Sequence, residues 1–319
     1  MRQWKEERCD RPEQCAAART EKVKRLSDLT YGIVGMGLMG GSLGKAVREN
    51  VLCVPSCGGR IFGADKSGAS LSLAERQHII DRPFSISETD EMLAQCDVVF
   101  VCLYPHDTAE FLISRKNAFK PGSVVTDISG VKAEIFSRLD EIVRSDVDFI
   151  PGHPMAGSEK EGFAHSDGSI FRGHNYIVMP LERTKSESLA LFKQLISCMG
   201  FSRIVETDAR THDHKVAFTS QLCHVIAGAL VDSSEDPAVT AFGGGSFEDL
   251  TRIAMINAPL WAELFLANRT ELLSCIEAFE SSLRRLTSYI AGNDRESLEQ
   301  YLSAVREKRI SMGRTEVTA

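Results

Sequence analysis

The chain has 319 residues and a mass of 35.1 kDa, a length that favours two domains over three. Its 43% hydrophobic and 25% charged residues are typical of globular domains, so they exclude disordered, collagen-like and mini-protein chains. The 37 basic residues against 44 acidic ones give a net charge of −7, and the pI is near 5.7. This balance argues against a dedicated surface for nucleic acid or for anionic membranes.

Targeting and metal-binding signals are also missing from the sequence. No apolar run approaches the ~20 residues that span a bilayer, and residues 1–30 lack the apolar core of a secretion signal. The nine cysteines do not have the spacing of zinc ligands. We therefore expect a cytoplasmic protein with reduced thiols, no metal site, and neither membrane nor nucleic acid as a partner.

Residues 1–29 have little apolar periodicity, and we expect a flexible extension there. From residue 30 to residue 206, short apolar strands alternate with helices, which predicts an α/β doubly wound (Rossmann) parallel sheet. The predicted strand 97–103 is continuously apolar after Asp97, as expected for a strand buried on both faces. Elements at 176–179, 186–199 and 203–205 are expected to extend the same sheet. The other predicted strands cover 31–34, 60–64, 123–126 and 149–150, and the predicted helices cover 38–49, 70–77, 108–115 and 133–143.

The strand pattern stops after Glu206, and an all-α domain is predicted over residues 207–310. One long helix is expected over 208–232, with further helices within 262–289 and 295–308. Three glycines at 243–245 are expected to form a flexible turn between them. Residues 311–319 are expected to be a polar tail.

A glycine-rich turn provides the first functional signal. Gly35, Gly37 and Gly40 form a G-x-G-x-x-G pattern directly after a predicted strand and at the start of a predicted helix. In that context the glycines allow a tight turn, close approach of a pyrophosphate, and close packing of helix on strand. The amides of Leu38 and Met39 would face the phosphates at the helix N-terminus. The sequence therefore predicts a dinucleotide site.

Asp65 follows the second predicted strand, where a carboxylate accepts hydrogen bonds from the adenosine ribose. Its charge would repel a 2′-phosphate, which favours NAD, although NADP stays possible because Lys66 follows directly. The separation from Gly40 is longer than usual, and residues 51–58 are interpreted as an inserted loop.

Two segments contain candidate catalytic side chains. His153 lies just past the predicted strand 149–150, at the edge of the sheet where nucleotide-binding folds hold their ligands. In the first helix of the all-α domain, spacings of 4, 3 and 4 residues place Asp213, Ala217, Ser220 and His224 on one face. Such a face is either an ordinary core stripe or part of a site, and the residues alone leave both open.

The sequence resembles the prephenate/arogenate dehydrogenase family of tyrosine biosynthesis from about residue 31 to about residue 286. The resemblance depends most on the stretch His153-Pro154-Met155-Ala156-Gly157 together with Thr251-Arg252-Ile253-Ala254, which are specific in combination. Further matching residues are Gly35, Gly37, Gly40, His212, Asp213, Ser220, His224, the run 247–250, Pro259, Trp261 and Asn268.

The resemblance implies an oxidoreductase that converts prephenate to 4-hydroxyphenylpyruvate with hydride transfer to NAD. It assigns His153 as the base and Arg252 as the guanidinium that binds a substrate carboxylate. His224, Ser220, Ser158 and Glu159 would contact the substrate or shape the pocket entrance. The family is typically dimeric, so a homodimer through the helical domain is expected.

Two positions depart from the family pattern. Family members carry Asp-x-x-Ser-x-Lys after the fifth strand, with the serine bonded to the catalytic histidine, whereas this chain has Gly130 there and Ser129 one place earlier. Either Ser129 replaces that serine as a catalytic residue or the bond is absent. Glu248 stands where some relatives have a lysine near the pocket, which would make the entrance more acidic.

Three alternatives stay open at this point. The substrate could be arogenate, with Glu248 or Glu159 binding its amine. A hydroxy-acid dehydrogenase of the 6-phosphogluconate type would need a catalytic lysine, for which Lys215 is the candidate. A dinucleotide-binding sensor without turnover is the alternative from another class.

Overall fold

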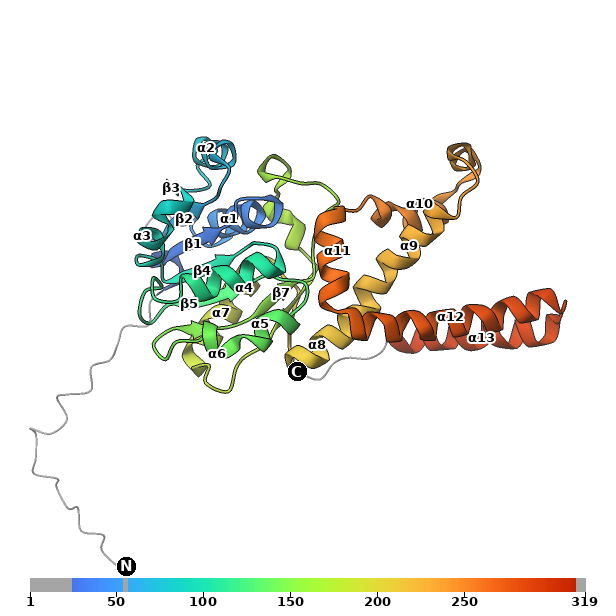
Figure 1. The fold of residues 1–319 in the computed structure, drawn as a ribbon. Coiled ribbons are helices and arrows are strands. Elements are labelled where there is room, and N and C mark those ends of the chain that lie inside the picture. Colours follow the sequence, from blue (N-terminus) through green and yellow to red (C-terminus); the bar gives the residue numbers. More distant parts are fainter. Residues whose placement is uncertain (1–24, 54–56, 314–319) are drawn as a thin grey trace, which may run out of the picture.

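A computed structural model describes residues 25–53 and 57–313, and its nucleotide-binding part is built on one six-stranded parallel sheet. The strands lie in the order β3-β2-β1-β4-β5-β6 (Figure 1). The chain adds β2 and β3 on one side of β1 and then β4, β5 and β6 on the other side, so the order of strands along the sheet switches between β1 and β4. The predicted doubly wound sheet is confirmed, and its switch point marks the edge where ligands bind in this architecture. The strands are β1 (Thr30–Val34), β2 (Arg60–Ala64), β3 (Arg82–Phe84), β4 (Val98–Val101), β5 (Val124–Asp127) and β6 (Asp148–Phe149).

Helices cover both faces of this sheet, and its central strands β1, β4 and β5 are buried along their whole length. Along β4, Val98 and Phe100 belong to one apolar core, whereas Val99 and Val101 belong to the core on the opposite face. This two-sided burial is the physical reason for the continuous apolar run that the sequence shows there. The helices are α1 (Leu38–Asn50), α2 (Gly68–Arg76), α3 (Thr89–Leu93), α4 (Pro105–Ser114), α5 (Ala133–Ser137) and α6 (Leu139–Ile142).

The last three strands of this region do not extend the main sheet, as the sequence had suggested, but form a sheet of their own. Strand β7 (Gly152–Pro154) pairs antiparallel with β8 (Asn175–Val178), which pairs parallel with β9 (Arg203–Glu206), and α7 (Ser186–Cys198) connects the last two. Pro151 has no amide hydrogen to continue the ladder beyond β6, and the chain turns into β7 at this point.

Three other expectations need correction. Leu26 and Leu29 are buried in the core and the Tyr31 hydroxyl donates to the Leu26 carbonyl, so residues 25–29 are not part of a flexible extension. Residues 1–24, for which flexibility was predicted, lie outside the described residues, as do residues 54–56 of the predicted loop 51–58. The helix expected over 133–143 is divided at Arg138, and β3 and α3 were not predicted.

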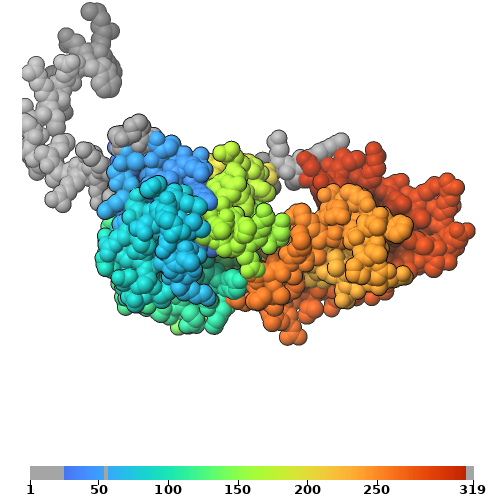
Figure 2. All heavy atoms as spheres, turned by 90° about the horizontal axis from the view of Figure 1, so that it is seen from above, coloured from blue at the N-terminus to red at the C-terminus, as the bar shows by residue number. Residues whose placement is uncertain are grey.

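Beyond β9 the chain is helical. Helix α8 (Ala209–Val216) continues through a π-helical segment (Ala217–Gln221) into α9 (Leu222–Asp232), as one long helix was expected to do. Helices α12 and α13 lie side by side and project from the nucleotide-binding part (Figures 1 and 2). The remaining helices are α10 (Gly245–Thr251), α11 (Ala258–Ala267), α12 (Arg269–Ala291) and α13 (Arg295–Met312), the last of which includes the first two residues of the expected tail.

Within the described ranges, no helix combines the length and the apolar character needed to cross a membrane.

Candidate active site

The glycine-rich turn connects β1 to α1 with the geometry that its motif predicts. Gly35 has φ +92°, and a Cβ there would lie 2.4 Å from the Cys102 carbonyl oxygen. A Cβ on Gly40 would lie 1.9 Å from the Gly35 carbonyl oxygen, so both positions require glycine for packing. Gly37 is different, because no described atom comes within 4 Å of its Cβ position. It therefore provides open space beside the first turn of α1, where free amides bind anions.

Asp65 supports this turn from the end of β2. Its Oδ2 accepts a hydrogen bond from the Met36 amide at 2.5 Å, and its Oδ1 accepts one from the Ser67 amide at 2.6 Å. Each carboxylate oxygen keeps a second lone pair for a ligand hydroxyl. Lys66 beside it is exposed.

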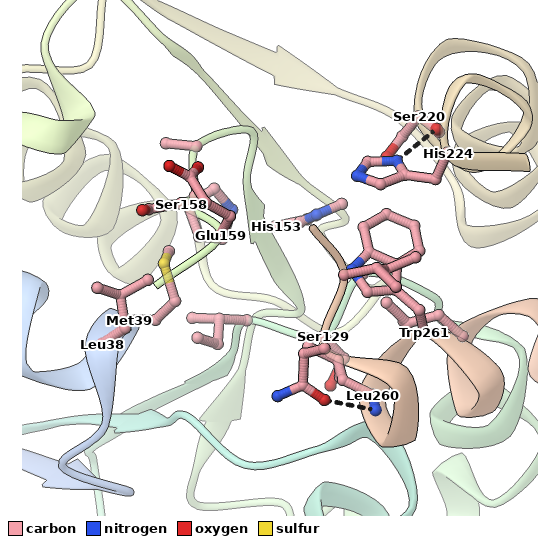
Figure 3. Close-up of a pocket in the computed structure, with 18 of the residues that line it drawn as sticks. Leu38, Met39, Ser129, His153, Ser158, Glu159, Ser220, His224, Leu260 and Trp261 are labelled. Carbon is pink, nitrogen blue, oxygen red and sulfur yellow. Dashed lines mark hydrogen bonds between the residues drawn. The ribbon is translucent and has the colours of Figure 1, made fainter. Parts of the chain in front are cut away.

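A cavity of about 660 Å³ extends from this turn to the helical domain. Figure 3 shows His153, Ser158 and Glu159 on one side of it and Ser220, His224 and Trp261 on the other. All but two of the predicted site residues line this cavity, and the two exceptions are Gly35 and Asp65. The predicted residues that line it are Gly37, Leu38, Met39, Gly40, Ser129, His153, Ser158, Glu159, Ser220, His224 and Arg252.

His153 lies on β7 and is hydrogen-bonded to a second histidine. Its Nδ1 is 2.9 Å from Nε2 of His212, whose Nδ1 is 2.7 Å from Oδ1 of Asp213. Burial, reinforced by the neighbouring His212 and Lys132, lowers the pKa of His153 well below its ordinary value. Burial also lowers the pKa of His212, against the opposing effect of Asp213. Both imidazoles are therefore neutral at neutral pH, and His153 can accept a proton.

Of the two alternatives left open for Ser129, the structure agrees with the second, in which no hydrogen bond joins it to His153. The Ser129 hydroxyl is buried without a hydrogen-bond partner among the described residues, and its amide donates to Asp127. Gly130 is the position that faces the imidazole, because a Cβ there would lie 3.7 Å from Nε2 of His153. Adjacent residues after a strand point in different directions, so a serine one place earlier does not replace a serine at 130. Ser129 still lines the cavity.

His224 is held by two contacts in the helical domain. Its Nδ1 donates to the Ser220 carbonyl at 3.0 Å, one turn earlier in the π-helical segment. Its ring stacks on Trp261 with centroids 3.5 Å apart and planes at 28°. Burial lowers the pKa of His224, and Arg252 lowers it further. Since a carbonyl oxygen can only accept, Nδ1 carries the proton and Nε2 is free for a ligand.

Arg252 and Glu159 face each other across the cavity. The guanidinium Nη1 lies 3.7 Å from Oε2 of Glu159, and the Arg252 side chain is 60% exposed. This loose pair leaves most donors of Arg252 available to an anion. Ser158, beside Glu159, is exposed, and its hydroxyl accepts from the Lys160 amide.

Beneath the cavity lies a buried ion pair that the sequence analysis missed. The Lys132 ammonium donates to Oδ2 of Asp127 at 2.5 Å and to the Gly152 carbonyl at 2.6 Å. Both side chains of the pair are completely buried. The signal that could have revealed it is a charge at the last position of the buried strand β5, Asp127, followed five residues later by Lys132.

Two residues named for alternative readings lie elsewhere. Lys215 is exposed on α8 and Glu248 is exposed on α10, and neither lines the cavity. Lys215 therefore gives no support to the hydroxy-acid dehydrogenase alternative, and Glu248 does not make the cavity more acidic. Among the described residues, no cluster of three or more His, Cys, Asp or Glu side chains could hold a metal ion.

Comparison with known proteins agrees with this arrangement. The family described as prephenate dehydrogenase, nucleotide-binding domain, matches residues 45–205, and the one described as prephenate dehydrogenase, dimerization domain, matches residues 208–304. The chain belongs to the prephenate dehydrogenase family. The resemblance noted in the sequence is thereby confirmed.

Individual members of the prephenate dehydrogenase family match over most of their length. Prephenate dehydrogenase of Bacillus subtilis is 25% identical over 289 residues, covering 88% of this chain and 75% of that protein. Cyclohexadienyl dehydrogenase of Zymomonas mobilis is 26% identical, covering 88% and 94%. The solved structure of prephenate dehydrogenase from A. aeolicus, in complex with hydroxyphenyl propionate and NAD+, superposes with a TM-score of 0.79. It is 31% identical and covers 91% of this chain and all of that one.

Proposed function

We propose that this chain catalyses the oxidative decarboxylation of prephenate to 4-hydroxyphenylpyruvate with hydride transfer to NAD. The observation that carries the proposal is that His153 of the nucleotide-binding domain and Arg252 of the helical domain line one cavity with the glycine-rich turn. A base, a carboxylate-binding cation and a dinucleotide site thus share one space. The family membership and the solved relative that contains NAD+ and a hydroxyphenyl acid support the same chemistry.

The residues present fit NAD. Gly37 leaves room for a pyrophosphate next to the N-terminal amides of α1, and Asp65 is placed by two backbone amides at the end of β2. A carboxylate there binds ribose hydroxyls and disfavours a 2′-phosphate, which supports NAD over NADP. NAD supplies hydride acceptance when it is bound.

His153 would act on the ring hydroxyl of prephenate. Its Nε2 takes the proton of the hydroxyl group while the ring carbon that carries this hydroxyl gives up a hydride, which makes a dienone. The dienone loses its ring carboxylate as CO2, the ring becomes aromatic, and the proton returns to the phenolic oxygen. The products are 4-hydroxyphenylpyruvate, CO2 and reduced cofactor, with no net proton. Aromatisation drives the reaction, so the protein mainly orients the substrate and holds the proton.

The helical domain would bind the two carboxylates of prephenate. Arg252 offers a planar fork of donors that suits a carboxylate. Among the described residues, the ion pair of Arg252 is the loose one with Glu159, so Glu159 is the side chain that competes with the substrate for this guanidinium. His224 and Ser220 would contact the remaining polar groups of the substrate, and Trp261 holds the His224 ring. Ser158 and Glu159 would shape the entrance.

Arogenate is the second candidate substrate, because it carries an amine in place of the keto group of prephenate. Glu159 is a cavity-lining carboxylate that could bind that amine, and it also faces Arg252. Comparing the two substrates at equal concentration distinguishes the candidates.

We further propose that the chain is a homodimer through its helical domain. Large apolar side chains are exposed there, among them Phe242 at 93%, Leu266 at 72% and Ile290 at 62%. Exposed apolar surface of this kind marks an interaction site. Sedimentation should show a species of about twice the chain mass, and a 35.1 kDa species at micromolar concentration would contradict the dimer.

The decisive assay follows the absorbance of reduced nicotinamide with prephenate or arogenate, each with NAD or NADP. His153→Asn removes the proton acceptor, so kcat should fall about 10²–10⁴-fold with cofactor Kd unchanged. Arg252→Gln should instead raise KM about 10–100-fold, since it removes a charge-assisted carboxylate contact of ~1.5–3 kcal/mol. Saturable NAD binding without reduction on either substrate would select a sensor without turnover. A His153→Asn variant near the wild-type rate would refute the assigned base.

A further inference from the structure

We propose that His212, held by Asp213, is a positioning residue that fixes the proton of His153 on Nδ1 and so leaves Nε2 free as the base. The inference rests on the proposed function, because it explains how the base of that reaction is kept in its working form. It concerns two side chains of α8 that the resemblance matched without giving them a role.

The direction of each hydrogen bond follows from Asp213. Its Oδ1 accepts from the Lys132 amide at 2.9 Å, and its Oδ2 accepts from the Ala133 amide at 2.9 Å. Backbone amides can only donate, so these contacts favour the ionised carboxylate, which can only accept. Nδ1 of His212, at 2.7 Å from the same carboxylate, must therefore carry a hydrogen.

The neutral His212 ring then has a lone pair on Nε2. Nδ1 of His153 lies 2.9 Å from this atom, so it must be the donor in the bond between the two rings. In a neutral imidazole, a proton on Nδ1 leaves the lone pair on Nε2. Nε2 is also the atom that lies toward Gly130, which lines the cavity.

His212 is well suited to hold this arrangement because it cannot move easily. The residue is 1% exposed, and its ring meets that of His153 edge to face, with centroids 5.1 Å apart and planes at 66°. The side chain of Asn268 adds a further restraint, since its Nδ2 donates to the backbone carbonyl of Asp213 at 2.9 Å. A buried ring with a fixed partner on each nitrogen has no alternative orientation that satisfies both.

Glycine at position 130 makes His212 more important in this chain. A side chain at 130 would approach Nε2 of His153, but Gly130 has none and the Ser129 hydroxyl has no partner. Among the described residues, His212 is the side chain to which His153 is hydrogen-bonded. The orientation of the base thus depends on the Nδ1 side of its ring.

The test compares His212→Leu with His212→Gln. Leucine cannot accept a hydrogen bond, so kcat should fall about 10²-fold or more, while the KM of prephenate and the Kd of NAD change less than about twofold. The amide of glutamine offers an oxygen to His153 and an NH2 to Asp213, so His212→Gln should recover at least about a tenth of the wild-type kcat. His214→Leu is the matched control, because His214 is an exposed histidine of the same helix bonded to Glu271. It should leave kcat unchanged.

Nitrogen NMR of labelled histidine in the substrate-free protein gives a readout that a merely structural role would not change. The His153 signals, identified by their loss in His153→Asn, should show the proton on Nδ1 in the wild type and in His212→Gln. In His212→Leu the proton should redistribute toward Nε2. A wild-type proton on Nε2, or a His212→Leu variant that keeps its kcat within twofold, would overturn the proposal. If His212→Leu does not fold, the wild-type spectrum alone decides.

The two proposals fail in different ways. If wild-type protein shows the Nδ1 proton but forms no reduced nicotinamide from prephenate or arogenate, the proposed function is wrong and the positioning role of His212 stands. If it turns over prephenate with the proton on Nε2, the function stands and the positioning role is wrong.

Discussion

Replacing Lys132 by methionine should destabilise the nucleotide-binding domain strongly, because the residue is fully buried and paired with a buried carboxylate. The ammonium donates to Asp127 at 2.5 Å and to the Gly152 carbonyl at 2.6 Å, and both side chains of the pair are fully buried. Methionine has a similar length and fills the space. It leaves Asp127 as a buried charge whose Oδ1 already has no partner among the described residues.

The size of the effect follows from this isolated charge. Removing one partner of a buried ion pair costs ~3–5 kcal/mol, because the remaining ion keeps its desolvation penalty without compensation. The total stability of a domain is only about 5–15 kcal/mol. For a domain of this size, each kcal/mol lowers Tm by about 2–4 °C, so Lys132→Met should lower Tm by about 6–20 °C.

Urea unfolding and calorimetry of three variants test this reasoning. Asp127→Asn combined with Lys132→Met removes both charges and keeps an acceptor for the Ser129 amide, so the double variant should recover at least about 2 kcal/mol. Lys185→Met is the matched control, because Lys185 is 53% exposed and pairs with Asp148 at 3.3 Å. It should change stability by less than about 0.5 kcal/mol. A loss below ~1 kcal/mol for Lys132→Met would refute the argument that the charge is uncompensated.

Two further predictions concern the cofactor and the base. Gly37→Ala should leave Tm unchanged but raise the Kd of NAD at least about tenfold, because its Cβ enters open space where the pyrophosphate approaches. Gly40→Ala should instead prevent normal folding. Titration of both variants with NAD checks this, and equal NAD affinities of Gly37→Ala and the wild type would contradict it. The acid limb of the kcat/KM profile should lie below pH 6.5, since burial lowers the pKa of both His153 and His224 and each is neutral above its pKa. If kcat/KM already drops above pH 7 as the pH is lowered, one of the two histidines is assigned wrongly.

The strands of the main sheet could be predicted from the sequence because their burial on both faces requires uninterrupted apolar runs. Strand β4 is the clearest example, with Val98 to Val101 all inaccessible to solvent. Strand β3 could not be predicted, since it has three residues at the edge of the sheet and a proline at its centre. The second sheet was misassigned because the direction of β7 against β8 depends on tertiary pairing, for which the sequence carries no local signal.

The site residues differ in how much information was needed to predict them. The glycine-rich turn is a local motif, and its position between a strand and a helix was sufficient to assign it. His153 needed the family resemblance, because a single histidine after a strand is usually structural. The contact of His153 with His212 joins residues 59 positions apart and depends on how the two domains pack. The role of Ser129 stayed open for the same reason, since only the structure shows that Gly130 is the residue facing the imidazole.

The base of this site exists in its working form only where the two domains meet. His153 belongs to β7, its hydrogen-bond acceptor His212 belongs to α8, and the amides that orient Asp213 lie at the start of α5. Other bonds close the same junction, including the His106 amide with Glu263 at 2.6 Å and the Asn257 side chain with the Tyr104 hydroxyl at 3.0 Å. Separation of the domains would therefore remove the acceptor from His153 and at the same time move Arg252 away from it. Domain packing and the basicity of Nε2 are thus coupled through the same atoms.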